Sequence, residues 1–256
     1  MIKILLCCLN EAENLQKLLP NLEREMQLVK RDFEIWFCLD GTSDASLEVI
    51  KEFSPRIKIK VLPQINQRGL GLAYKRLFLE VIADSSNSDL IITLDADSTH
   101  NPNQISSMIE HFEKNALDFL VASRFCGNSV MDDFPLHRQL ISKSTSLLLQ
   151  NIFAVKKISG EKLQDYTSGY RIYRAQKLKE LFEKEKNNFI TEPEFTYTCE
   201  LLIKLSRVNS RFDEIAISYD YGKKIGASKL RIMRNFFRLG VMLFKLNQTP
   251  AHYLKK

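Results

Sequence analysis

The stretch Leu90-Ile91-Ile92-Thr93-Leu94-Asp95-Ala96-Asp97 contains the features of this chain that decide its fold. Its first five residues form a short, mostly apolar run of the kind found in a strand that is buried on both faces. Two carboxylates follow at once, and Pro102 marks the start of a helix soon afterwards. In an open α/β sheet, side chains at this end of a strand project into the crevice where ligands bind. We therefore predict a binding site at the end of this strand.

Apolar runs typical of strands alternate with segments of helical periodicity along most of the chain. This alternation predicts an α/β fold with a mostly parallel sheet and helices on both faces. Strands are expected at residues 2–9, 33–39, 57–62, 90–94 and 119–122. Helices are expected after Asn10, which would form a capping box with Glu13, and at residues 135–153 and 191–205.

Length and composition limit the classes of protein to which the chain can belong. The 256 residues, 45% of them hydrophobic, are enough for one large α/β domain. Five scattered cysteines contain no Cys-x-x-Cys pair, which argues against a zinc site or a disulfide framework and favours the cytoplasm. No apolar run approaches the roughly 18 residues of a membrane span. We expect a catalytic domain over residues 1–228 and a basic amphipathic helical segment over residues 229–256.

The positive charge of the chain is concentrated in its last part. Residues 221–256 contain nine Lys or Arg and no Asp or Glu, whereas the net charge of the whole chain is +6. Between residues 229 and 246, basic side chains alternate with methionine and phenylalanine, a pattern that suits the interface of an anionic membrane. A helix that packs on the domain and exposes a solvated basic face has the same pattern. We expect a peripheral protein on the cytoplasmic face of a membrane, with no nucleic acid as partner.

Polar residues follow five successive predicted strands. In chain order they are Asn10 and Glu11, then Asp40, then Arg68, Gly69 and Gly71, then Asp95 and Asp97, and finally Ser123 and Arg124. Each position alone has a simple explanation, such as a helix cap or a tight turn. Because the ends of parallel strands meet at one edge of a sheet, the set together predicts a nucleotide-type site. Asp95 and Asp97 supply hard oxygen ligands that suit Mg²⁺ or Mn²⁺ and, through the ion, a diphosphate.

With these residues in order, the chain resembles the family 2 glycosyltransferases, which have a Rossmann-like GT-A fold. Within that family it is most similar to the dolichyl-phosphate (polyprenyl-phosphate) mannosyltransferases. The motifs that carry the resemblance lie at residues 10–14, 40–44, 68–73, 95–102, 123–124, 165–171 and 226–230. The last motif, Gly-x-Ser-Lys, separates this branch from many other members. The resemblance implies the transfer of a sugar, mannose first of all, from a nucleotide sugar to a polyprenyl phosphate, with inversion at the anomeric carbon.

The resemblance also implies a role for each site residue. The nucleotide sugar would be bound by Asn10, Glu11, Asp40, Arg68, Gly69, Gly71 and Asp95. Asp95 and Asp97 would hold the metal ion. The acceptor phosphate would be bound by Arg124, Arg138, Ser142, Lys223 and Lys229. Asp165 would orient a cation or a sugar hydroxyl, or cap a turn. A phosphate with a second pKa of about 6 is largely ionised at pH 7 and needs little help from a general base.

Departures from the family pattern leave alternatives open. Leu39 stands where the family has the first acid of an Asp-Asp pair, so GDP-mannose, UDP-glucose and UDP-N-acetylglucosamine all stay candidate donors. Lys223 replaces an arginine, which keeps the charge but loses bidentate phosphate geometry. A saccharide or protein hydroxyl as acceptor would instead need a carboxylate base, for which Asp165 and Glu194 are the candidates. A catalytically inactive relative that only binds the nucleotide sugar is the third alternative.

Overall fold

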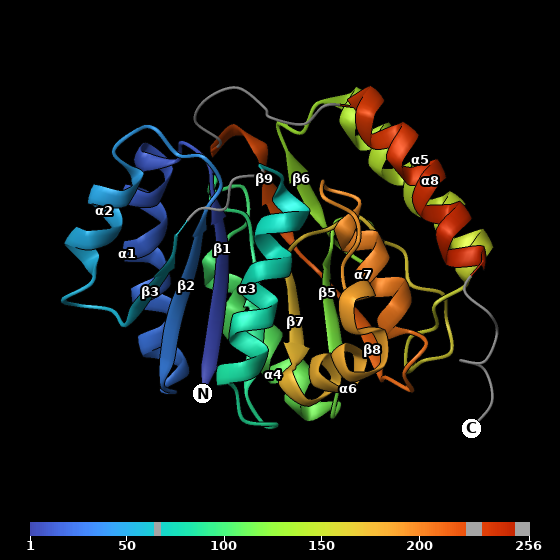
Figure 1. Ribbon diagram of the computed structural model, residues 1–256, viewed down its shortest axis with the longest axis horizontal. Coiled ribbons are helices and arrows are strands. Elements are labelled where there is room, and N and C mark those ends of the chain that lie inside the picture. Colours follow the sequence, from blue (N-terminus) through green and yellow to red (C-terminus); the bar gives the residue numbers. More distant parts are fainter. Residues whose placement is uncertain (64–67, 224–231, 249–256) are drawn as a thin grey trace.

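A seven-stranded sheet forms the centre of the computed structural model, which describes residues 1–63, 68–223 and 232–248 (Figure 1). The strand order is β3-β2-β1-β4-β7-β5-β8, and only β7 runs antiparallel to its neighbours β4 and β5. The strands are β1 (Ile2–Cys8), β2 (Phe33–Leu39), β3 (Ile59–Leu62), β4 (Leu90–Thr93), β5 (Phe119–Ser123), β7 (Arg171–Arg174) and β8 (Phe212–Ala216). The predicted mostly parallel α/β sheet is confirmed.

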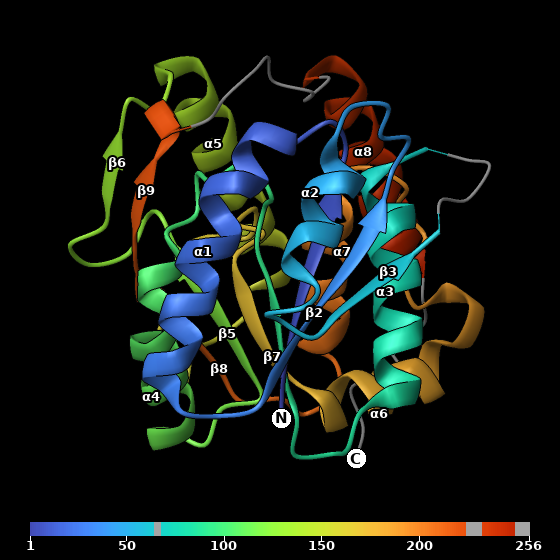
Figure 2. The same cartoon turned by 90° about the vertical axis from the view of Figure 1, so that its left-hand side faces the viewer.

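Helices cover both faces of the sheet, so each face has its own hydrophobic core. One core contains side chains of α1 (Ala12–Val29), α2 (Ser46–Phe53) and α4 (Ile105–Lys114). The other contains those of α3 (Leu70–Asp84), α6 (Ala175–Glu185) and α7 (Tyr197–Leu205). Figure 2 shows α1 and α4 on one side of the sheet and α3 and α6 on the other. Leu90 and Ile92 point into the first core and Ile91 into the second, which explains why β4 is apolar at successive positions.

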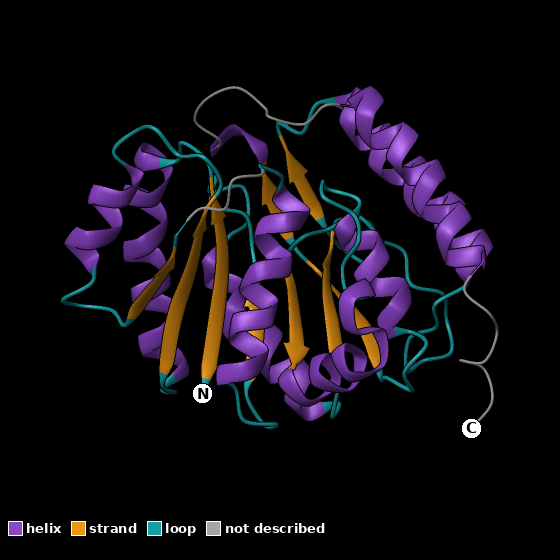
Figure 3. Cartoon of the chain, viewed as in Figure 1, coloured by secondary structure: helices purple, strands orange, loops and turns teal. Residues whose placement is uncertain are grey.

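The carboxyl ends of β1, β2, β4 and β5 lie at one edge of the sheet, the upper edge in Figure 3. β1 is parallel to β2 and to β4. β5 has the same direction as β4 because both run antiparallel to β7, which lies between them. The loops after these four strands therefore meet at this edge, which we call the carboxyl edge.

A two-stranded sheet and a long helix stand beyond the carboxyl edge (Figure 1). β6 (Val130–Asp132) pairs in parallel with β9 (Ser218–Asp220). A bridge between His100 and Tyr219 ties β9 to the loop after β4. The helix is α5 (Leu136–Phe153), in agreement with the predicted helix at residues 135–153. Single 3-10 turns cover Pro102–Gln104, Lys186–Asn188 and Tyr221–Lys223.

The helix predicted at residues 191–205 begins only at Tyr197, so its first turn was predicted wrongly. Pro193 disfavours the helical conformation in the residue before it. The carboxylate of Glu200 accepts hydrogen bonds from the backbone N–H groups of Thr191 and Glu192 and fixes an irregular segment there. This segment, residues 191–196, reaches the carboxyl edge, and we refer to it as the Pro193 segment.

The last described helix, α8 (Ile232–Gln248), presents three different faces. Three apolar side chains are buried in the core that contains α3, α6 and α7: Leu239, Met242 and Leu246. Three aromatic side chains are exposed: Phe236, Phe237 and Phe244. Three cations face acids of the Pro193 segment: Arg234, Arg238 and Lys245. Among the described helices, none combines the length and the apolar character that crossing a membrane would need. The predicted boundary at residue 228 lies outside the described residues.

Candidate active site

The loop after β4 holds Asp95 and Asp97 at the carboxyl edge. The backbone N–H of Asp95 donates to Nδ1 of His100 at 3.0 Å, so Nδ1 carries no proton and this imidazole is neutral. Burial lowers the pKa of His100 in spite of the nearby carboxylates of Asp95 and Asp97. The hydroxyl of Thr99 donates to Oδ1 of Asp97 at 2.7 Å. His100 thus fixes the backbone of the loop at Asp95, and Thr99 fixes the carboxylate of Asp97.

The donor atoms of this loop suit a divalent ion that is shared with a substrate. In the described parts of the chain, no group of three or more His, Cys, Asp and Glu forms a complete metal site. Mg²⁺ is often bound by one or two carboxylates together with substrate phosphates. The side chain of Asp95 is one-third exposed, whereas His100 is buried and bonded to the backbone of the loop. The two carboxylates therefore fit an ion that binds together with a diphosphate.

Asp40, which follows β2, binds the turn that opens α3. Both of its carboxylate oxygens accept the backbone N–H of Gly69, at 3.0 and 3.2 Å. Its carbonyl oxygen accepts Nε of Arg68 at 3.3 Å. Burial raises the pKa of Asp40 and outweighs the opposite effects of Gly69 and Arg68. Three residues that the sequence placed in the nucleotide site are therefore in direct contact.

The two glycines of this turn make room for protein backbone. Gly69 has a φ of 155°, and a Cβ there would lie 2.4 Å from the carbonyl oxygen of Pro193. A Cβ on Gly71 would lie 2.0 Å from the carbonyl oxygen of Glu192. The N–H of Gly71 donates to the Pro193 carbonyl at 2.9 Å. The Pro193 segment thus packs directly on the glycine turn, a contact that the sequence did not reveal.

Asn10 and Glu11 join the end of β1 to the loop after β2. Asn10 has a left-handed φ of 53°, and its side-chain oxygen accepts the backbone N–H of Ser43 at 2.8 Å. The predicted capping box is therefore wrong, because α1 starts after Glu11 without a side-chain cap and Asn10 bonds a different loop. Glu11 is buried and accepts the side-chain amide of Asn14 at 2.6 Å. Both residues lie at the carboxyl edge, and their contact with a nucleotide stays a prediction.

A buried ion pair joins the loop after β5 to the segment before β7. Nε and Nη2 of Arg124 donate to the two oxygens of Asp165, each at 2.9 Å, and Nη2 also donates to Thr167 at 2.6 Å. Asp165 further accepts the backbone N–H groups of Arg124, Thr167 and Ser168. Burial alone would raise the pKa of Asp165, but the charge and hydrogen bonds of Arg124 hold it below its usual value. This bidentate geometry fixes a cation at the carboxyl edge.

The ring of Tyr219 connects this ion pair to the Asp95 loop. It lies 5.8 Å from the guanidinium of Arg124 and 5.5 Å from the ring of His100. His100 in turn accepts the backbone N–H of Asp95. The cation and the two carboxylates of the loop therefore belong to one site. Sequence reasoning missed Tyr219 because its strand pairs with residues far away in the chain.

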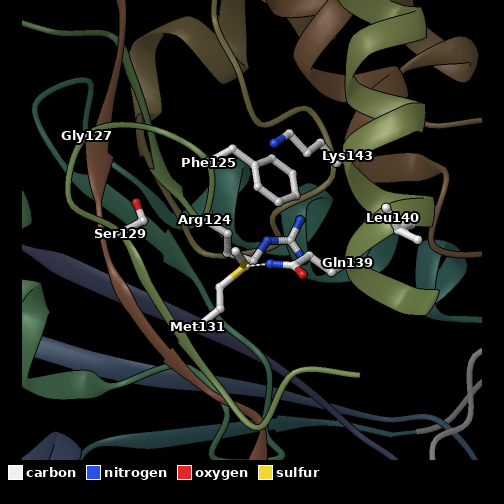
Figure 4. Close-up of a pocket in the computed structure, with 8 residues that line it drawn as sticks. All are labelled: Arg124, Phe125, Gly127, Ser129, Met131, Gln139, Leu140 and Lys143. Carbon is white, nitrogen blue, oxygen red and sulfur yellow. Dashed lines mark hydrogen bonds between the residues drawn. The ribbon is translucent and has the colours of Figure 1, made fainter. Parts of the chain in front are cut away.

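A pocket of about 280 Å³ lies between Arg124 and α5 (Figure 4). Figure 4 shows Arg124 and Lys143 reaching toward the ring of Phe125 from opposite walls. The other predicted acceptor residues that the structure describes, Arg138, Ser142 and Lys223, do not line this pocket. Arg138 and Ser142 lie on α5, with the Arg138 guanidinium 5.6 Å from the ring of Tyr221. Lys223 is exposed, 3.4 Å from a carboxylate oxygen of Asp220, and Lys229 lies outside the described residues.

The mostly parallel α/β sheet with the Asp-x-Asp loop at its carboxyl edge is a GT-A-like fold. The sequence profile of glycosyl transferase family 2 matches residues 3–182. The chain therefore belongs to this family. The resemblance stated from the motifs is confirmed at the level of the family.

Known relatives and solved structures agree with this assignment. The chain is 27% identical over 246 residues to a dolichol-phosphate mannosyltransferase of Pyrococcus furiosus, covering 93% of this chain and 63% of that one. It is 25% identical over 256 residues to a dodecaprenyl-phosphate galacturonate synthase of Rhizobium johnstonii, covering 95% and 67%. The chain thus spans about two thirds of the length of these relatives. The glucosyl-3-phosphoglycerate synthase of Mycobacterium tuberculosis, solved with Mn²⁺, UDP and phosphoglyceric acid, shares the fold with a TM-score of 0.64 at 12% identity, covering 98% of this chain and 80% of that one.

Proposed function

We propose that this protein transfers a sugar from a nucleotide sugar to polyprenyl phosphate, with inversion and with Mg²⁺ or Mn²⁺. The observation that carries the proposal is the buried Arg124, a cation that Asp165 fixes and that the rings of Tyr219 and His100 connect to the Asp95 loop. A site that brings two anionic substrates together needs such a cation opposite its metal-binding acids. The names of the Pyrococcus and Rhizobium relatives support a lipid phosphate as acceptor, and the name of the Pyrococcus relative makes mannose the first sugar to test.

The carboxylates near the site also favour a phosphate acceptor over a hydroxyl acceptor. A hydroxyl needs a carboxylate base that is available to take its proton. Asp165 is fully buried and both of its oxygens are bonded to Arg124. Glu194 lies 3.2 Å from Nη2 of Arg234. Both candidate bases are therefore paired with arginines. Since an ionised phosphate requires no such base, this pairing supports a lipid phosphate as the acceptor.

Asp95 and Asp97 would hold the metal ion, and the residues around them would fix its place. The bound ion would neutralise the diphosphate of the departing nucleotide. Thr99 orients one oxygen of Asp97, and His100 fixes the backbone at Asp95. Arg124 would attract the acceptor phosphate to the other side of the reacting centre. Asp165 keeps Arg124 in that position.

Purified protein, Mn²⁺, polyprenyl phosphate and a panel of labelled nucleotide sugars would test this function. The panel contains GDP-mannose, UDP-glucose and UDP-N-acetylglucosamine, because Leu39 leaves the base and the sugar open. We expect one donor to give a labelled lipid that depends on the metal. Transfer to a saccharide or protein hydroxyl but not to the lipid, or transfer from none of the donors, would refute the proposal.

We further propose that α5 and α8 seat the protein on a lipid surface on the cytoplasmic side of a membrane. Their exposed apolar side chains are Leu136, Leu140, Leu147, Leu148 and Ile152 on α5, and Phe236, Phe237 and Phe244 on α8. Both helices have similar inclinations along one margin of the molecule in Figure 1. Neither helix contains Asp or Glu, which suits an anionic leaflet. Such seating would bring the site to a polyprenyl substrate.

The double variant Phe236→Ser/Phe237→Ser should weaken binding to anionic liposomes by about tenfold or more, because a fully buried Phe contributes about 1.5–3 kcal/mol. Both side chains are exposed and lie away from the core, so the fold should be retained. Co-sedimentation with vesicles of increasing lipid concentration measures the effect. Leu28→Ser, an equally exposed apolar residue on α1, is the matched control and should bind like wild type. Equal liposome binding by wild type, the double variant and Leu28→Ser would contradict the proposed contact of α8 with the membrane.

A further inference from the structure

Glu192 lies between α8 and the glycine turn at the carboxyl edge. Its side chain is fully buried, and Oε2 accepts the hydroxyl of Thr196 at 3.0 Å. The same oxygen lies 3.6 Å from Nη1 of Arg238, and Oε1 lies 3.7 Å from Nζ of Lys245. Its carbonyl oxygen occupies the space beside Gly71. Glu192 thus contacts α8 through its side chain and the glycine turn through its main chain.

The cations that face the Pro193 segment form one stripe on α8. Arg234, Arg238 and Lys245 are separated by four and seven residues, which places them on the same side of a helix. Arg234 contacts Glu194, and the other two contact Glu192. The exposed phenylalanines occupy a different side. The basic residues of α8 therefore engage acids of the protein itself.

These contacts are electrostatic but incomplete. Oε1 of Glu192 and Nε of Arg238 are buried, and neither has a hydrogen-bond partner among the described residues. A buried charge needs its partner, and stability alone is often served equally well by apolar side chains at such a position. The Pro193 segment is thus held at its start by Glu200, and the side chain of Glu192 additionally faces the cations of α8.

We propose that Glu192 is a positioning residue that links the seat of α8 to the affinity of the donor site. Its contacts with Arg238 and Lys245 hold the Pro193 segment on the glycine turn. That turn donates the Gly69 N–H to Asp40, so its position sets that of the Asp40 carboxylate. The inference rests on the proposed function, which assigns Asp40 and this turn to the nucleotide sugar. A lipid surface bound to the phenylalanines of α8 would act on the donor site through the same residues.

Glu192→Gln tests this link, because it removes the charge while keeping an oxygen for Thr196. Isothermal titration calorimetry with UDP and with GDP, each with Mn²⁺, measures donor-site affinity without an acceptor. We expect the Kd of the nucleotide that binds wild type to rise about five- to tenfold, in the usual range of coupling between sites. In transfer assays the donor KM should rise similarly, with kcat within about twofold. Glu183→Gln, an exposed acid on α6, is the matched control and should leave Kd unchanged.

The double variant Arg238→Gln/Lys245→Gln removes the partners on α8 and should raise Kd to the same extent. Adding Glu192→Gln to it should have little further effect, because residues that act on each other are not additive. If Glu192→Gln does not fold, the double variant provides the test. An unchanged Kd in these variants, including the case where only thermal stability falls, would overturn the inference. Wild type that binds a nucleotide but transfers to no lipid would refute the proposed function alone, whereas wild type that binds neither nucleotide would overturn both.

Discussion

Asp97→Ala is expected to lower kcat/KM for sugar transfer by about a thousandfold. An ion bound at a departing diphosphate contributes several kcal/mol to the transition state, and about 4 kcal/mol corresponds to a thousandfold in rate. Asp97 is one of only two carboxylates in the loop, so its loss leaves Asp95 alone to bind the ion. Initial rates at saturating Mn²⁺ and at donor concentrations below KM would measure the loss, and calorimetry of Mn²⁺ with nucleotide would show its cause.

Two further substitutions separate the charge of Asp97 from its hydrogen bond. Asp97→Asn keeps an oxygen that can accept the hydroxyl of Thr99 but removes the charge, so it should be nearly as inactive as Asp97→Ala. Thr99→Val removes the hydrogen bond and keeps both carboxylates, so it should lose far less activity. Asp32→Ala, an exposed acid that precedes β2 at the opposite edge of the sheet, controls for loss of a carboxylate. Near-normal turnover of Asp97→Ala would remove the metal ion from the mechanism.

The sheet could be predicted because it depends on local patterns, and the same patterns bring the candidate site residues to one edge. The run before Asp95 is apolar at each position that faces one of the two cores, so its sequence alone indicates a buried strand. Strand direction then places Asp40, Asp95 and Arg124 at one edge, whatever the details of the loops. The order of the motifs along the chain indicated the family, which the match over residues 3–182 confirmed.

Contacts between distant segments could not be predicted in the same way. Gly71 was expected to bind the nucleotide sugar, and nothing near it in the sequence indicates that the backbone of Glu192 occupies the adjacent space. The basic pattern of α8 fits both a lipid surface and a helix that packs on the domain, since helical periodicity reports only which residues share a side. Arg238 and Lys245 both meet Glu192, which belongs to a segment that the pattern had assigned to a helix. Pro193 and the hydrogen bonds to Glu200 make this segment irregular instead.

Asp165→Asn is expected to lower the free energy of unfolding at pH 7 by about 3 kcal/mol, because removing one member of a buried ion pair leaves the other charge uncompensated. Asparagine would keep one oxygen for the N–H groups of Thr167 and Ser168 but would turn its amide toward the N–H of Arg124. The native pKa of Asp165 lies below its unfolded value of about 3.9, so its contribution is complete above that pH and is lost as the pH falls through the native pKa. Urea unfolding from pH 7 to pH 3 should therefore show wild type and variant converging below about pH 4.

The double variant Arg124→Gln/Asp165→Asn separates the stability of this pair from its function. It contains no isolated buried charge, so it should be more stable than Asp165→Asn alone, with a favourable coupling in the double-mutant cycle. Transfer activity should be lost, because the double variant lacks the cation that would face the acceptor phosphate. Glu161→Gln, an exposed acid paired with Lys157, should leave both the unfolding midpoint and activity unchanged. Recovery of activity together with stability would show that Arg124 acts only as a structural partner of Asp165, and the acceptor phosphate would then have to be bound by other cations of the site.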